Sequence, residues 1–148
     1  MTRTLALVLA TIIPMTALAG DPATPEVHGV FRPAGDSELE SFLWVSRIIM
    51  VFADSPADPR FQQQIDLLME DEERLADRDV VVLTDTDPAA RRPIRMKLRP
   101  RGFQMVLVDK DGVVKLRKPY PWSVREITRS IDKTPMRQRE VVERRKGS

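Results

Sequence analysis

Four short apolar segments stand out from the polar background of the chain and predict four β-strands. Two of them, residues 48–53 and 80–84, are uninterrupted and rich in β-branched residues, which is typical of strands covered on both faces of a sheet. The other two, residues 103–108 and 113–117, are separated only by Asp109-Lys110-Asp111-Gly112. Because a turn ending in Asp-Gly between apolar segments favours a hairpin, we expect these two strands to pair antiparallel.

Between and after the strands, apolar and capping residues recur at helical spacing. Pro59 precedes a predicted helix over residues 60–76, whose apolar stripe consists of Phe61, Ile65, Leu68, Met69 and Leu75. Pro93 divides the segment after the second strand into two short helical pieces. Ser123 and Glu126 form a capping box that opens a final helix, which is expected to end before Pro135.

The predicted order of elements is strand, helix, strand, short helix, two strands and a closing helix. The first strand, helix and second strand form a right-handed parallel βαβ unit. This order of elements is that of thioredoxins. We therefore predict an α/β, thioredoxin-like three-layer fold with a central four-stranded mixed sheet, a parallel βαβ unit and a C-terminal β-hairpin plus helix.

The first nineteen residues have the pattern of a cleaved signal peptide. Arg3 supplies a positive start, residues 5–17 are mostly apolar, and Ala17-Leu18-Ala19 is a small-x-small cleavage site. Because this apolar segment is too short to span a bilayer, we expect no transmembrane anchor after cleavage and a periplasmic or secreted protein. The predicted organisation is a signal peptide at 1–19, a flexible lead-in at 20–41, a thioredoxin-like domain at 42–142 and a charged tail at 143–148.

Four segments in this order resemble the P-DUDES domain family. They read WxxR (44–47), ERLxxRDV (73–80), VxKDGVVKLR (108–117) and IDxxPMRxRE (131–140), and the resemblance covers roughly residues 40–142. The family is a cysteine-poor, thioredoxin-like domain of unknown function, found in small exported bacterial proteins and in vertebrate secreted matrix proteins with sushi repeats. The resemblance implies a thioredoxin-like fold, and it supplies no reaction and no catalytic residues.

The chain contains no cysteine. It therefore cannot form disulfides, exchange thiols or bind metal through sulfur. The loop after the first strand, where thioredoxins carry their dithiol, reads Asp54-Ser55-Pro56-Ala57-Asp58-Pro59, and no proline stands at residues 102–104, the place of the thioredoxin cis-proline. Ser55 as a nucleophile needs a base, and His28 in the lead-in is the only histidine. A helix cap is the commoner role for a serine at such a position.

Charge is unevenly distributed along the chain. Residues 21–90 hold 16 Asp/Glu and 5 Lys/Arg, a net charge of −11, whereas residues 91–148 hold 18 Lys/Arg and 6 Asp/Glu, a net charge of +12. The densest basic segment is residues 91–101, in which six of eleven residues are basic, and its candidate binding residues are Arg91, Arg92, Arg95, Lys97, Arg99 and Arg101. One interpretation is a surface that binds a polyanion. The other is neutralisation of the acidic helix between Glu70 and Asp79.

Trp44 and Arg47 precede the first predicted strand and admit two interpretations. In the first, they mark a ligand groove at the sheet edge. In the second, Trp44 packs against the core and Arg47 pairs with a nearby carboxylate. For the protein as a whole we expect an exported monomer that needs no cofactor or metal and functions by binding. The candidate partners are an envelope protein, held at loops 54–59 and 100–104, or a polyanionic surface, with no specific nucleic acid. The alternative is a hydrolytic enzyme that uses carboxylates or Ser55.

Overall fold

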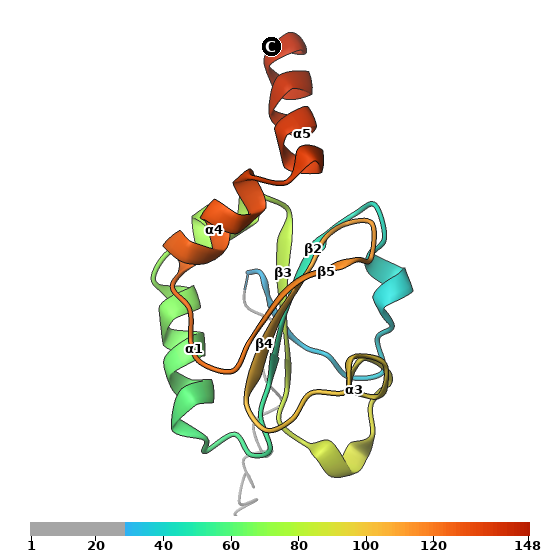
Figure 1. Cartoon of the computed structure of the whole chain (residues 1–148), viewed down its shortest axis with the longest axis vertical. Coiled ribbons are helices and arrows are strands. Elements are labelled where there is room, and N and C mark those ends of the chain that lie inside the picture. The colour runs from blue at the N-terminus through green and yellow to red at the C-terminus, as the bar shows by residue number, and fades with distance from the viewer. Residues whose placement is uncertain (1–28) are drawn as a thin grey trace, which may run out of the picture.

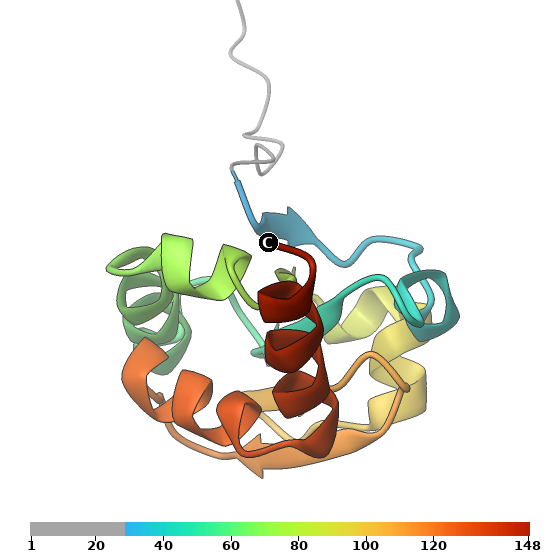
Figure 2. The same cartoon turned by 90° about the horizontal axis from the view of Figure 1, so that it is seen from above.

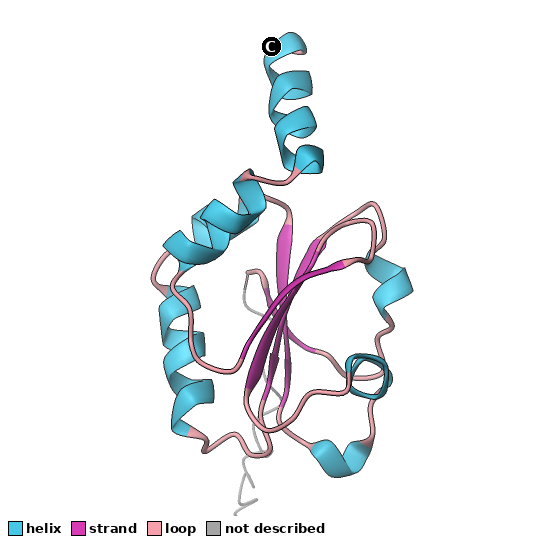
Figure 3. Cartoon of the chain, in the orientation of Figure 1, coloured by secondary structure: helices cyan, strands magenta, loops and turns pink. Residues whose placement is uncertain are grey.

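The computed structural model describes residues 29–148, in which a five-stranded sheet runs through the centre (Figures 1 and 3). The strand order across the sheet is β1-β3-β2-β4-β5. The strands are β1 (Phe31–Pro33), β2 (Arg47–Phe52), β3 (Val80–Asp85), β4 (Gln104–Val108) and β5 (Val114–Lys118). The predicted signal peptide lies outside the described residues.

The pairing of the strands agrees with the predicted topology. Strands β2 and β3 are parallel, with Arg47 opposite Val80. Strand β4 runs antiparallel to β2, so that Gln104 lies opposite Phe52, and β4 and β5 form the expected antiparallel hairpin. The parallel βαβ unit and the hairpin through residues 109–113 are therefore confirmed.

Helices cover both faces of the sheet and make a three-layer α/β structure (Figure 1). On one face lie α1 (Pro59–Met69), α2 (Glu72–Ala76) and α4 (Val124–Asp132), and on the other lie the short 3-10 helix η1 (Leu39–Phe42) and α3 (Pro93–Leu98). A second 3-10 helix, η2 (Pro88–Ala90), precedes α3. The Ser123–Glu126 capping box at the start of α4 is present, as expected.

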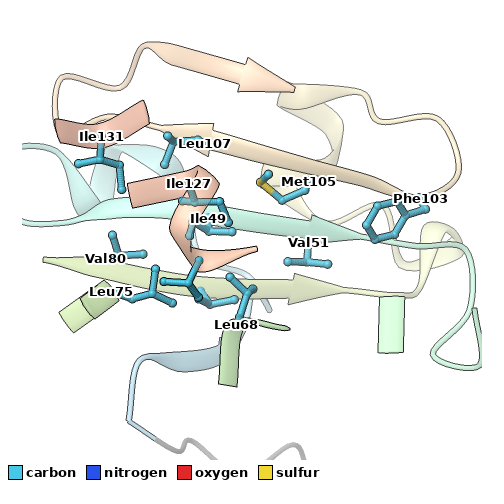
Figure 4. Close-up of a cluster of buried hydrophobic side chains, with 12 residues drawn as sticks. Ile49, Val51, Leu68, Leu75, Val80, Phe103, Met105, Leu107, Ile127 and Ile131 are labelled. Carbon is cyan, nitrogen blue, oxygen red and sulfur yellow. The ribbon is translucent and has the colours of Figure 1, made fainter. Parts of the chain in front are cut away.

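Alternating side chains of β2 supply both halves of the core. Ile49 and Val51 join the cluster beneath α1, α2 and α4 (Figure 4), whereas Met50 and Phe52 join the cluster beneath η1 and α3. All six residues of β2 are buried. Burial on both faces explains why this strand is apolar without alternation, because a half-exposed strand places polar residues at every second position.

Two features differ from the predicted elements. The sheet has a fifth strand, because β1 pairs parallel with β3 along its open edge. The predicted helix over residues 60–76 is two helices, since the backbone of Asp71 leaves the helical region with φ −149° and ψ 58°. This break lets Glu72 accept a hydrogen bond from the Val30 amide at 2.7 Å while Leu75 remains fully buried.

The last helix, α5 (Pro135–Lys146), stands away from the body of the domain (Figure 1). Thr134 caps it by accepting a hydrogen bond from the Arg137 amide. The view from above shows α5 over one end of the sheet (Figure 2). Part of the segment predicted as a charged tail, up to Lys146, is therefore helical. Within residues 29–148, no helix has the length and apolar composition needed to cross a bilayer.

Candidate functional site

At one end of the sheet, the loop after β2 meets the loop before β4. Phe52 and Gln104 are partners in the register of β2 and β4, so the two loops adjoin. The Arg60 guanidinium lies 5.6 Å from the centre of the Phe103 ring and connects them. The two loops at 54–59 and 100–104 are therefore side by side, as a shared binding surface requires.

The polar side chains of the first loop serve its local structure. The Ser55 hydroxyl accepts a hydrogen bond from the Ala57 amide at 3.1 Å, and the Asp58 carboxylate accepts one from the Arg60 amide at 2.9 Å. Asp58 is the N-cap of α1, and the Arg60 side chain lowers its pKa. These are turn and capping roles, so nothing in the described geometry activates Ser55 as a nucleophile.

Arg95 lies inside the molecule beneath these loops. Its side chain is 8% exposed and pairs with the Asp85 carboxylate at 3.0 Å. It also donates hydrogen bonds to the backbone carbonyls of Ala53 and Asp85, and its guanidinium lies 5.2 Å from the centre of the Phe52 ring. Arg95 thus ties the ends of β2 and β3 together and does not face solvent.

Two further cations of the 91–101 segment are engaged in surface ion pairs. Arg92 pairs with Asp36 at 2.8 Å, and Lys97 pairs with Glu40 and lowers the pKa of that carboxyl. The partners of the segment therefore come from η1, the loop before it and β3. No ion pair between this segment and the acidic helix residues 70–79 is present in the described part of the chain.

Arg91, Arg99 and Arg101 remain, and we call these three residues the basic surface. All three are exposed, and none forms an ion pair within residues 29–148. Arg91 ends η2 and Arg99 ends α3, both with left-handed backbone angles (φ 47° and 50°). The six-residue helix between them separates the two positions by about 10 Å, which is close to the Debye length at physiological salt. Their potentials therefore overlap.

At the opposite end of the sheet, a buried ion network holds α5. Arg47 is 1% exposed and lies 3.0 Å from both Asp109 and Glu140. Lys110 and Arg137 also pair with Glu140. Burial works to raise the pKa of Glu140, but hydrogen bonds from Arg47 and Lys110 outweigh it and lower the pKa from 4.5 to about 2. The expected pairing of Arg47 with a carboxylate is confirmed.

Trp44, in contrast, does not pack in the core. Its side chain is 69% exposed, and its backbone is in the left-handed region (φ 63°), held by a hydrogen bond from its amide to the Lys110 carbonyl at 2.8 Å. It lines a hollow of about 270 Å³ with Lys110, Met136, Arg139, Glu140 and Glu143. The packing interpretation of Trp44 is wrong. Nothing in the local sequence indicates its exposure, because α5, the other wall, is distant along the chain.

Comparisons with known proteins agree with this fold. Residues 38–140 match the family described as a domain of unknown function (DUF4174). A reduced 2-Cys peroxiredoxin from Plasmodium vivax superposes with a TM-score of 0.50 and 18% identity, over 64% of this chain and 80% of the peroxiredoxin. An exposed lipoprotein thioredoxin from Streptococcus pneumoniae superposes with a TM-score of 0.50 and 14% identity, over 65% of this chain and 90% of the thioredoxin. No curated protein matches the chain. The predicted thioredoxin-like fold is confirmed.

Proposed function

The chain belongs to the DUF4174 family of domains of unknown function, and we propose that it is an exported binding domain whose basic surface contacts a polyanion. Thioredoxins and 2-Cys peroxiredoxins use cysteine thiols, and this chain has none. A domain of this fold that lacks thiols cannot do thiol chemistry, but its loops and surfaces are still available to bind another molecule. The resemblance to the P-DUDES family and the signal-like first nineteen residues support a place outside the cytoplasm.

The observation that carries the proposal is the contrast within the 91–101 segment. Arg92, Arg95 and Lys97 each have an acidic partner, whereas the three residues of the basic surface have none within residues 29–148. Unpaired guanidinium groups bind phosphate, sulfate or carboxylate groups in bidentate geometry. The ends of η2 and α3 hold the backbone of two of them at fixed positions, so binding orders their side chains but little of the backbone.

Removal of the basic surface tests the proposal. The variant Arg91→Gln/Arg99→Gln/Arg101→Gln is compared with wild type for retention on heparin-agarose over a salt gradient. Wild type should be retained at low salt and released as salt rises, because polyanion binding depends on counterion release. The variant should pass through unretained, with a melting temperature close to that of wild type since exposed side chains contribute little stability.

A matched control separates the basic surface from net charge. Arg125→Gln/Arg129→Gln/Arg145→Gln removes three exposed arginines from other parts of the molecule and lowers the charge equally. This control should be retained like wild type. Equal loss of retention in both variants, or no retention of wild type at low salt, would show that the basic surface is not a specific binding site.

A further inference from the structure

Exposed apolar side chains gather at the end of the domain opposite the basic surface. Trp44, Val45 and Val113 are more than half exposed there, on two turns joined by the hydrogen bond from Trp44 to Lys110. On α5, the Val142 side chain is 48% exposed. Single exposed apolar residues are ordinary, but a tryptophan beside several others marks a surface suited to contact with another molecule.

Trp44 and Val142 line two hollows that adjoin along α5. The hollow of about 270 Å³ beside Trp44 shares Arg139 and Glu143 with a second hollow of about 450 Å³ along α5, which extends past Val142 to Lys146. We call this combined feature the α5 groove. A twelve-residue helix is about 18 Å long, so the groove has the length of a short peptide segment.

The shape of the α5 groove favours a narrow occupant. Helix α5 rises from the domain (Figure 1). The hollow beside Trp44 has one wall from α5 and another from Trp44 and Lys110, so it is concave. A flat lipid surface contacts convex tips and does not enter such a hollow. A peptide segment fits along one wall and contacts the other, as in helix-in-groove recognition.

The charges of the α5 groove define the chemistry of the occupant. Lys110 and Glu140 neutralise each other in the ion network. Arg139, Glu143 and Lys146 have no ion pair within residues 29–148, which leaves two cations against one carboxylate. The apolar contacts come from Trp44, Met136 and Val142. The complement is a segment with apolar side chains flanked by acidic ones.

The foot of the groove is also rigid. The left-handed backbone of Trp44 is unfavourable for a bulky residue, and such conformations persist where the surrounding structure imposes them, often at binding sites. The ion network around Arg47 fixes α5 against the same turns. A preformed groove binds with a small loss of conformational entropy.

We propose that the α5 groove docks an acidic amphipathic polypeptide segment of a partner protein. An apolar side chain of the segment contacts Trp44 and Met136, and its carboxylates pair with Arg139 and Lys146. This site is separate from the basic surface and does not depend on the function proposed for it.

The test uses a synthetic helical peptide with Leu at positions i, i+3, i+4 and i+7 and with Glu at most others. Calorimetric titration into the wild-type chain should show binding. Versions with Leu replaced by Ala, or with Glu replaced by Lys, should bind at least about tenfold more weakly. The first change removes the apolar contacts and the second removes the ion pairs. In a Trp122→Phe background Trp44 is the only tryptophan, and its emission should shift to the blue on binding.

Two variants and two matched controls assign the binding to the α5 groove. Trp44→Ala and Arg139→Glu should each weaken binding about tenfold or more. Tyr120→Ala, an exposed aromatic at the other end of the sheet, and Arg125→Glu, an exposed arginine on α4, should leave binding unchanged. The triple variant of the basic surface should also bind the peptide normally. Either proposal can therefore be disproved without affecting the other.

Three results would overturn the inference. The first is no binding of the Leu/Glu peptide to wild type. The second is equal weakening by the control variants. The third is binding to phosphatidylglycerol vesicles that is lost in Trp44→Ala, which would identify the surface as a membrane contact and not a peptide groove.

Discussion

At the scale of single residues, the environment of a charged side chain decides its role more than its type does. Arg95 and Arg99 are four residues apart and chemically identical, yet Arg95 is buried against Asp85 and Arg99 is exposed without an ion partner in the described chain. Removing a cation from a buried pair leaves the carboxylate without compensation. The same change on the surface costs little.

We predict that Arg95→Ala lowers the free energy of unfolding by about 3 kcal/mol, because Asp85 remains buried without its partner. The matched change Arg99→Ala should alter it by less than about 0.5 kcal/mol. Urea unfolding followed by far-UV circular dichroism measures both values. Comparable losses in the two variants would contradict the structural role assigned to Arg95.

At the scale of elements, α5 is attached chiefly through charged groups. Glu140 accepts ion pairs from Arg47, Lys110 and Arg137. At the end of α4, just before α5 begins, Asp132 pairs with Arg78 at 2.8 Å. The hydrogen bonds between these two side chains outweigh the opposite effect of burial, so the pKa of Arg78 is raised and the pKa of Asp132 is lowered. Attachment of this kind should depend on pH and salt more than an apolar contact does.

The variant Glu140→Gln should reduce the free energy of unfolding by about 2 kcal/mol at pH 7, through loss of charged hydrogen bonds. Glu140 has a folded-state pKa of about 2, below the value of 4.5 for an unperturbed carboxyl. Its contribution is therefore complete above pH 4.5 and is lost as the pH falls from 4.5 toward 2.

The difference between wild type and Glu140→Gln should accordingly shrink over that pH interval. Denaturant unfolding of both proteins at several pH values measures the difference, and Glu143→Gln is the control because Glu143 forms no ion pair among the described residues. A difference that stays constant from pH 7 to pH 2.5 would mean that the Glu140 charge does not hold α5.

At the scale of the whole molecule, the acidic and basic halves of the chain meet across the fold. Asp36–Arg92, Asp85–Arg95 and Glu40–Lys97 each join a carboxylate before position 91 to a cation after it. Charges that are segregated along the sequence are therefore largely mixed in the folded molecule. The basic surface and the α5 groove keep charges without an ion pair in the described chain, and they lie at opposite ends of the sheet.

Export of the whole molecule is a prediction from its first nineteen residues. In a bacterial expression host, intact-mass measurement of the protein from the periplasmic fraction should give a chain that starts at Gly20, because Ala17-Leu18-Ala19 is a small-x-small cleavage site. Full-length protein confined to the cytosol would disprove a cleaved signal. Replacing Ala17 and Ala19 with bulky residues should block cleavage and leave Met1 in place.

The sequence alone was sufficient for elements whose signals are local. Strands β2, β3, β4 and β5 follow from apolar segments, and the start of α4 follows from Ser123 and Glu126. Their order was enough to predict the thioredoxin-like topology, because short connections and right-handed crossovers leave few alternatives. Strand β1 was missed because three residues interrupted by proline carry almost no periodic signal.

Only the tertiary structure decided which side chains are available for binding. Arg47 and Glu140 meet across 93 positions of sequence, and Arg95 reaches the Ala53 carbonyl across 42. The exposure of Trp44 depends on the position of α5, which is set by that distant ion network. Burial and pairing are properties of neighbours in space, so a local pattern of residue types cannot distinguish a structural arginine from a free one.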